Sequence, residues 1–351
     1  MMAPIIMDQD FNLVGVIDAY DSLIWTERYD RAGDFELQIA ATPQTIGMLQ
    51  IDYYLYLEES EKVMIIEAIR LTTDFERGNY LKVTGRSLEA ILERRIVWDQ
   101  TTLDGYLQGQ IRKLLNDNII SPSDSERAIS NFKMENSTDV VITQTQINSQ
   151  YTGDNIFTVI CSICRDLGLG FKVTLSSLNE FVFKLYNGVD RSYNQDENNY
   201  VVFSPNFDNL INSEFVDNKV SYRTIGLIAG EGEGAERIKV PVAATHDTGL
   251  ERREVFIDAR DIQSDEEMEL EEYLAILAQR GFEKMSDMKE LNEFSGSMDT
   301  TLSFKYGRDF FLGDIVQVEN EYGIQATCRV TELIRSLNGK GYLEYPTFEM
   351  I

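Results

Sequence analysis

The sequence has little cysteine and histidine, and it has no long apolar segment. Three cysteines in 351 residues exclude a disulfide framework. No apolar run approaches the roughly 18 residues that a membrane helix needs. The first residues, MMAPIIMDQD, lack the basic and apolar segments of a secretory signal. We therefore expect no membrane segment and synthesis and folding in the cytoplasm.

Positive charge is also scarce. The chain has 32 Lys and Arg against 59 Asp and Glu, a net charge of −27. Nucleic-acid backbones are bound by basic side chains that displace counterions, so we expect no stable nucleic-acid binding. A hydrophobic content of 43% indicates a globular chain, and its length allows two or three domains.

Two of the cysteines form a C-x-x-C motif, Cys161 and Cys164, which could indicate a redox or zinc site. They lie in NIFTVICSICRDLG, where Cys164 shares an apolar helical stripe with Phe157, Ile160 and Leu167. A redox pair normally lies at a helix N-terminus, and a structural zinc needs four ligands. The sequence offers no second C-x-x-C and no histidine cluster, so we predict buried core thiols.

Two further motifs imitate catalytic or phosphate sites. The single histidine, His246, would have to serve any catalytic triad, but its neighbours ATHDTG are typical of a turn. The segment GEGEGAER, which starts at Gly230, would direct Glu231 and Glu233 at a phosphate, and no Gly-Lys-Ser/Thr follows. We predict a hairpin tip there.

Asp8, Asp10 and Asn12 imitate the start of a calcium loop. However, Leu13 replaces the necessary glycine, and the twelfth position is Ala19 instead of glutamate. We predict a hairpin tip whose Asp and Asn side chains cap their own backbone. The sequence thus predicts no catalytic, cofactor-binding or metal-ligating residue.

Residues 1–97 show strand periodicity, and they end in a short helix over Ser87–Leu92. The Arg94-Arg95 pair that follows is expected to pair with acidic residues. The predicted strands are Ile5–Met7, Leu13–Ile17, Leu23–Thr26, Phe35–Ile39, Tyr53–Leu57, Val63–Ile66 and Leu81–Thr84.

Residues 98–200 read as an α+β insertion. Their expected elements are a helix through Leu103, Leu107, Ile111 and Leu114, polar strands around Lys133–Ile147, the helix with the two cysteines, and a hairpin of Phe171–Leu175 and Phe181–Tyr186. Gly168 is expected to end the cysteine helix.

Residues 201–351 return to strands and carry one long helix. The helix is predicted over 264–291, with a capping box of Ser264 and Glu267. Its buried face would contain Leu270, Leu274, Leu277 and Phe282. Strands are expected at Tyr222–Ala229, Val240–Ala243 and Glu254–Asp258, followed by a three-stranded antiparallel meander over Tyr306–Phe348.

Four residues represent the buried sides of the predicted strands. The alternation of apolar and polar residues predicts that Phe35, Leu37, Cys328 and Val330 point inward. The residues alone therefore support a mainly β chain, with two antiparallel modules at 1–97 and 201–351 and a smaller mixed domain at 98–200.

Several blocks of sequence occur in an order that resembles the tail-tip baseplate hub family of siphophages and prophages. This family includes the hub region of tail-associated proteins. Its members are similar to the hub of contractile phage tails. The blocks are GDFELQIA and VTGRSLEAILERRIV, then FKLYNGVDRS and VVFSPNFDNLINSEF, and finally LGDIVQVEN, RVTELIRS and GYLEYPTF. The resemblance covers nearly the whole chain.

The resemblance implies two β-barrel-like modules per subunit and a homotrimer whose six barrels form a ring around the DNA path. Such a structural, non-enzymatic protein would need no cofactor. Its expected partners are a sixfold distal tail protein and the tail tube, with tape-measure and receptor-binding proteins as further candidates. It would be made in the host bacterial cytoplasm and end in the virion, at the tail tip. Many relatives extend further, so any enzymatic or adhesive part would lie on another protein or outside this sequence.

Two other functions remain open. A cell-wall hydrolase needs two carboxylates about 5–10 Å apart, and no motif among the 59 acidic residues selects a pair. A carbohydrate-binding adhesin module could use Tyr53, Tyr54 and Tyr56, although core packing explains those residues equally well.

Overall fold

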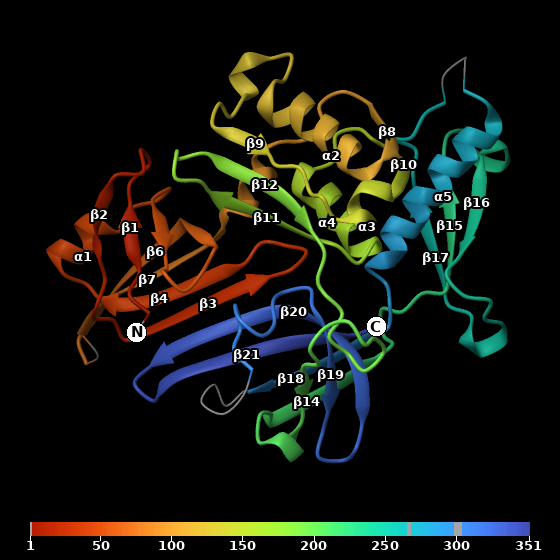
Figure 1. Cartoon of the computed structure of the whole chain (residues 1–351). Helices are drawn as coiled ribbons and strands as arrows, with labels where there is room; N and C mark the ends of the chain where they lie inside the picture. Colours follow the sequence, from red (N-terminus) through yellow and green to blue (C-terminus); the bar gives the residue numbers. More distant parts are fainter. Residues whose placement is uncertain (1, 77, 265–267, 298–303) are drawn as a thin grey trace.

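The computed structural model describes residues 2–76, 78–264, 268–297 and 304–351. Thirteen of the described strands form one sheet that contains both ends of the chain. The helices of the middle and late segments lie together above this sheet in Figure 1. The mainly β class is therefore confirmed.

The first part of the chain forms one end of the large sheet. Phe35 and Leu37 are buried beside Trp25, as the alternation predicted. The predicted short helix is a 3₁₀ helix, η1. The elements are β1 (Ile5–Met7), β2 (Leu13–Val16), β3 (Ser22–Arg28), β4 (Asp34–Ala40), α1 (Pro43–Met48), β5 (Tyr54–Tyr56), β6 (Val63–Asp74), β7 (Gly78–Ser87) and η1 (Leu88–Arg94).

The last part of the chain forms the other end. The predicted meander is confirmed, because β19 and β21 both pair antiparallel with β20 and a two-residue turn joins Asn338 to Gly341. Cys328 and Val330 are fully buried. The elements are β13 (Val202–Phe203), η4 (Pro205–Phe207), β14 (Ile211–Asn218), β18 (Leu291–Ser297), β19 (Ile315–Glu319), β20 (Gln325–Asn338) and β21 (Gly341–Met350).

The two ends meet along one seam, where β3 pairs antiparallel with β20 over Ser22–Arg28 and Glu332–Asn338. A bulge between Val330 and Glu332 precedes the seam. The described strands follow an open path from β14 to β2. Closure into barrels and the three domain boundaries therefore stay predictions.

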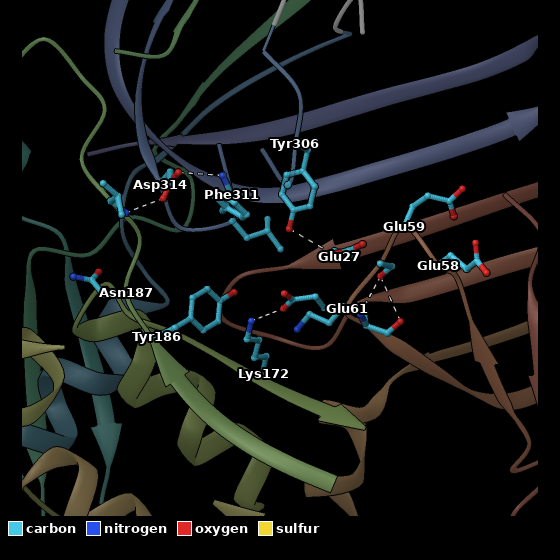
Figure 2. Close-up of a pocket in the computed structure, with 15 residues that line it drawn as sticks. Glu27, Glu58, Glu59, Glu61, Lys172, Tyr186, Asn187, Tyr306, Phe311 and Asp314 are labelled. Carbon is cyan, nitrogen blue, oxygen red and sulfur yellow. Dashed lines mark hydrogen bonds and ion pairs between the residues drawn. The ribbon is translucent and has the colours of Figure 1, made fainter. Parts of the chain in front are cut away.

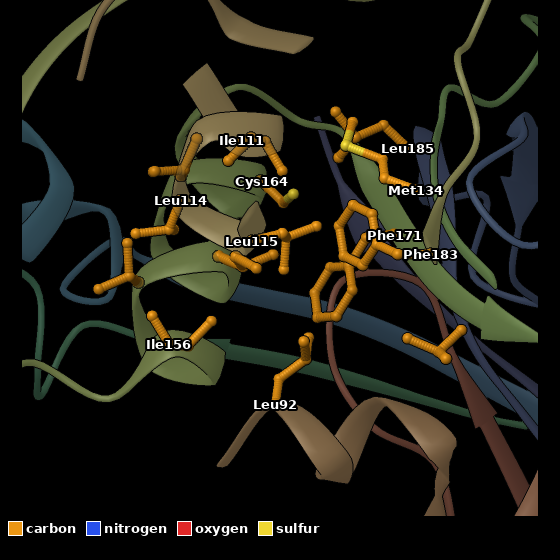
Figure 3. Packing of buried hydrophobic residues seen from close by; sticks show 14 of the residues in the cluster. Leu92, Ile111, Leu114, Leu115, Met134, Ile156, Cys164, Phe171, Phe183 and Leu185 are labelled. Carbon is orange, nitrogen blue, oxygen red and sulfur yellow. The ribbon is translucent and has the colours of Figure 1, made fainter. Parts of the chain in front are cut away.

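The middle segment combines small sheets with helices around the largest apolar core, shown in part in Figure 3. The predicted hairpin is present as β11 and β12. The elements are β8 (Thr101–Tyr106), α2 (Leu107–Leu115), η2 (Asn116–Ile120), η3 (Ser125–Arg127), β9 (Phe132–Met134), α3 (Val140–Gln144), β10 (Gln146–Tyr151), α4 (Ile156–Asp166), β11 (Gly170–Leu175) and β12 (Phe181–Tyr186).

Two expectations for this segment were wrong. Leu103 lies in β8, where it pairs with Ser149 in a two-stranded sheet, and the predicted helix begins only at Leu107, after Gly105 with its φ of +124°. The expected strands are present only at the two ends of their interval, as β9 and β10. Helix α3 lies between them and begins after Asp139, whose side chain caps it.

The late segment contains a second, three-stranded sheet with the order β16-β15-β17. Helix α5 packs on this sheet, on the right of Figure 1. The elements are β15 (Ile225–Ala229), η5 (Gly234–Glu236), β16 (Lys239–Ala243), η6 (Gly249–Glu251), β17 (Glu254–Asp258) and α5 (Leu270–Ser286). No helix within the described ranges is long and apolar enough to cross a membrane.

The extent of this helix was overestimated. Helix α5 begins at Leu270, after Glu269, and Glu267 of the predicted capping box lies outside the described residues. Leu270 and Phe282 are exposed, because the face that packs on the sheet carries Tyr273, Ile276 and Leu277, buried with Arg280 and Glu283. The predicted face was therefore correct for Leu277, which is buried, and in part for Leu274, which is half-buried, and wrong for Leu270 and Phe282.

Candidate functional site

Three parts of the chain meet at Tyr29, in the loop between β3 and β4. Its backbone N–H donates to the carbonyl of Thr331 in β20 at 3.0 Å, and its own carbonyl accepts from the N–H of Phe171 in β11 at 3.1 Å. The hydroxyl donates to the carbonyl of Gly168 at 3.2 Å. One residue therefore links the seam of the large sheet to the middle segment.

Two glycines fit the Tyr29 ring into this junction. A Cβ atom on Gly170 would lie 2.3 Å from the ring, and one on Gly313 would lie 2.2 Å from it. Arg329 lies over the ring, 5.5 Å from its centroid. Burial raises the pKa of Tyr29 to about 12. The Tyr29 ring therefore leaves no room for a side chain at either glycine.

A cleft of about 470 Å³ opens near the junction. Figure 2 shows side chains from the first strands, the middle segment and the last strands converging on it. It is lined by Glu27, Glu58, Glu59, Ser60, Glu61, Lys62, Lys172, Tyr186, Asn187, Val189, Tyr306, Gly307, Phe311, Leu312 and Asp314. This is the candidate site, because all three parts of the chain contribute to it.

Glu27 and Tyr306, which line the cleft, belong to a buried charge cluster that extends behind its wall. The Arg335 guanidinium pairs with the carboxylates of Glu27 and Glu344, at 3.3 Å to the latter, and all three side chains are less than 10% exposed. The guanidinium also lies 5.2 Å from the centre of the Tyr306 ring. Tyr342 donates a 2.9 Å hydrogen bond to Glu344. Burial, with the nearby Glu27 carboxylate, raises the pKa of Tyr306.

Several other charged groups of the cleft are also paired. Asp314 is 2% exposed, pairs with Arg191 at 2.7 Å, and accepts from the N–H of Val189 at 2.7 Å. Lys172 pairs with Glu61 at 2.5 Å. The hydrogen bond from Lys172 lowers the pKa of Glu61. These carboxylates act as ion-pair partners.

The ion pairs of the cleft show whether its carboxylates have the properties that a catalytic acid needs. A glycosidase acid needs a carboxyl group whose pKa is raised, and the Glu61 pKa moves in the opposite direction. Among the residues that the structure describes, no group of three or more His, Cys, Asp and Glu side chains could hold a metal ion. The arrangement is suited to holding the parts of the chain together.

The motifs singled out in the sequence lie away from the cleft. Cys161 and Cys164 are buried free thiols in α4, and burial raises the pKa of both. Their predicted core role agrees with this burial. His246 is exposed between β16 and β17. The glycine-rich loop at Gly230 leads from β15 to β16, so it is a hairpin tip as predicted.

The calcium-like turn and the tyrosines also have structural roles. Asp8 accepts from the N–H groups of Asp10 and Asn12 at 2.9 and 2.8 Å, so it caps its own turn as predicted. Tyr54 stacks on Phe11 with ring centroids 5.0 Å apart. The neighbouring tyrosines Tyr53 and Tyr56 are likewise half-buried against apolar cores. This packing leaves the adhesin hypothesis without its supporting observation.

The Arg94-Arg95 pair behaves only partly as expected. Arg94 pairs with Asp52 at 3.0 Å. Arg95 donates instead to the backbone carbonyl of Arg127 at 2.7 Å. The expectation of an acidic partner was therefore correct for the first arginine and wrong for the second, whose guanidinium donates to backbone carbonyls.

A second buried polar cluster, between β10 and α5, was not anticipated. The Tyr151 hydroxyl donates to the carboxylate of Glu283, and Arg280 lies 5.0 Å from the Tyr151 ring. Arg280 also pairs with Asp261 at 2.9 Å. Burial raises the pKa of Glu283. The sequence did contain a signal for this cluster, because Arg280 and Glu283 are charged residues at positions that fall on the buried side of the helix.

Comparisons with known proteins account for the whole architecture. The model of the family described as Siphovirus ReqiPepy6 Gp37-like protein matches residues 4–348. Three solved structures share the fold: the tail protein from Neisseria meningitidis MC58 (13% identity, TM-score 0.56, 99% of this chain and 96% of that one), the 43 kDa tail protein of prophage MuSo2 from Shewanella oneidensis (11%, 0.58, 99% and 98%) and prophage tail protein gp18 from Listeria monocytogenes EGD-e (12%, 0.55, 99% and 94%). No curated protein matches the chain.

Proposed function

The chain belongs to the Siphovirus ReqiPepy6 Gp37-like family, and from this premise we propose that it is a structural component of a bacteriophage tail. The observation that carries the proposal is the extent of the structural match. Three tail proteins share the fold over 99% of this chain and at least 94% of their own lengths. The large sheet, the middle segment and the late sheet are therefore all part of one shared architecture.

Within the tail, we assign the chain to the baseplate hub at the tip. It forms a homotrimer whose barrel-like modules, at 1–97 and 201–351, make a ring at the end of the tail tube. Its partners are the sixfold distal tail protein and the tube, with tape-measure and receptor-binding proteins adjacent. The protein is made in the host cytoplasm and resides in the virion. The order of the sequence blocks and the presence of strands at both ends support this assignment.

The charge supports a role in passing DNA. Basic side chains in a ring would bind phosphates and slow the duplex, whereas a net charge of −27 disfavours such contacts. The paired carboxylates of the cleft support a structural role over a hydrolytic one. The ring's inner wall is neutral to acidic in this proposal.

Sedimentation of the purified chain tests the assembly. We expect a trimer that tightens as salt is raised, because salt screens repulsion between acidic subunits within about 8–10 Å. A monomer at every salt and protein concentration would contradict the ring. Antibody labelling of virions tests the location, and label along the tube instead of at the tip would contradict a hub.

A gel-shift titration with duplex DNA tests the passage role. The chain is expected to bind no DNA at physiological salt. Micromolar binding at low salt would overturn this part of the proposal while leaving the tail assignment intact.

A further inference from the structure

The late three-stranded sheet is covered by a helix on one side. Ile228, Val242 and Ile257 of its strands are buried in one core with Tyr273 and Ile276 of α5. Strands β15 and β17 pair in parallel. Parallel pairs normally have both faces covered, because connections over the sheet place helices there.

The opposite side carries a bare apolar row. Leu227 in the central strand lies opposite Pro241 of β16 and opposite Phe256 of β17. Leu227 is 39% exposed and Phe256 is 56% exposed, and Pro241 is exposed as well. The row therefore runs without interruption across all three strands, unlike a singly exposed apolar residue.

Charged residues at the ends of the outer strands frame this row. Glu254 pairs with Arg252, and Asp258 pairs with both Arg237 and Arg260. The Arg237 guanidinium also lies 5.5 Å from the centre of the Phe256 ring. Glu254 and Asp258 therefore already have cationic partners within the chain.

Lys239, at the corner beside Pro241, is the exception. It is exposed, and the described part of the chain provides no ion pair for it. Among the described residues, Lys239 is therefore an exposed cation without an ion-pair partner, in a chain whose net charge is −27. A partner that covers the apolar row can gain a charge-assisted contact by placing a carboxylate at this corner.

We propose that this face binds an amphipathic helix of another protein, with its apolar side on Leu227, Pro241 and Phe256 and an acidic side chain opposite Lys239. Three strands span about 10 Å and five residues of strand about 17 Å. An α-helix is about 10 Å wide, and eleven residues of it are about 16 Å long. A second copy of this small face would provide far less than the roughly 800 Å² per partner of a stable dimer. The proposal does not depend on the hub assignment.

The test uses the full chain and labelled synthetic peptides of fifteen residues. One peptide carries leucines at i, i+3, i+4 and i+7 flanked by glutamates, a second replaces the glutamates by lysines, and a third scrambles the first. Fluorescence anisotropy is expected to give binding of the glutamate peptide at least about tenfold tighter than binding of the scrambled one. Equal binding of the two overturns the proposal.

Variants then locate the binding. Phe256→Ser is expected to weaken the glutamate peptide about tenfold or more. The matched control is Leu178→Ser, because Leu178 is 75% exposed in the turn between β11 and β12, and it should change nothing. Lys239→Glu should weaken the glutamate peptide and strengthen the lysine peptide.

Two results with the variants would contradict the proposal. If Phe256→Ser lowers the oligomeric state in sedimentation, a second copy covers the row and the helix proposal is wrong. If Leu178→Ser reduces peptide binding as much as Phe256→Ser does, binding is non-specific and the proposal fails. Thermal unfolding of each variant checks that these surface changes leave the fold intact.

Discussion

Two buried arginines join parts of the chain that are far apart in sequence, and they do so differently. Arg335 is enclosed by the carboxylates of Glu27 and Glu344 at the seam of β3 and β20. Arg280, between β10 and α5, pairs with Asp261 at 2.9 Å and with the more distant Asp154 at 3.7 Å. The first joint is also held by a backbone ladder, whereas these contacts of the second are made by side chains.

Hydrogen bonding distinguishes the joints further. In the described structure, the Nε of Arg280 has no partner, and neither does the hydroxyl of Ser149 or the carbonyl oxygen of the Asn148 side chain. A buried polar group without a partner costs about 1–3 kcal/mol. The comparison teaches that the Arg335 joint is fully paired among the described residues, whereas the Arg280 joint is not. We therefore expect the parts of the molecule to separate first at the Arg280 joint, the weaker of the two.

The largest effect is expected at the Arg335 joint. Arg335→Met leaves two carboxylates buried without their cation, which should lower the free energy of unfolding by about 3–5 kcal/mol. Urea unfolding measures it. Lys82→Met is the matched control, because the Lys82–Glu36 pair is exposed and should contribute less than about 1 kcal/mol. Equal losses would show that the Arg335 cluster is not a cohesive element.

The next effect concerns the Tyr29 junction. Gly313→Ala should lower the free energy of unfolding by about 2–4 kcal/mol, because the new Cβ would meet the Tyr29 ring and the residue has a φ of +90°. Gly307→Ala separates the two causes. Gly307 has a φ of +80° and open space around it, so only the conformational cost of about 1 kcal/mol applies. Thermal unfolding of both variants in parallel would refute the steric argument if they lost equal stability.

The two cysteines test the core beside the weaker joint, since α4 packs against α5. Replacing Cys161 and Cys164 by alanine should cost about 1–3 kcal/mol and leave assembly unchanged. Cys328→Ala, at another buried thiol, is the control and should behave in the same way. Mass spectrometry of metal content is the second measurement, and metal lost only from the double variant would show a site in place of a core.

The smallest effect is expected at the weaker joint, where Glu283 is buried beside Arg280. Burial raises the pKa of Glu283, so the folded protein holds the proton more tightly than the unfolded chain. Stability from this group is therefore present at low pH and is lost as pH rises through the folded pKa. Glu283→Gln should be more stable than wild type at pH 8, by about 1 kcal/mol. The gap should narrow toward pH 5 in thermal unfolding, and a gap that widens would contradict the assignment.

Local patterns predicted much of the fold. The bounds of β1, β12 and β17 agree with the expected ranges, and the Asn338 turn was correctly placed, because alternation and turn chemistry are local. Leu103 was misassigned because its spacing to Leu107 fits a helix as well as a strand followed by a helix. Helix α5 was extended too far because acidic residues are typical both of a first turn and of the segment before it.

The candidate site could not be predicted in the same way. Glu27 and Arg335 are 308 positions apart, and only the pairing of β3 with β20 brings them together. Each does occupy the buried phase of its strand, in line with Trp25 and Leu333, so a charged residue among apolar ones was a usable hint. The Tyr29 contact with Gly313 has no local signal, because it depends on how three parts of the chain are placed.

The seam also sets an order of events during synthesis. Strand β3 emerges from the ribosome early, but β20, its neighbour, follows about 300 residues later. At 5–20 residues per second, that is roughly 15–60 s. During this interval the β3 edge has no neighbour and is open to pairing with another nascent chain. We expect the yield of native protein to depend on the spacing of ribosomes along the messenger RNA. The stability of the finished sheet should matter less.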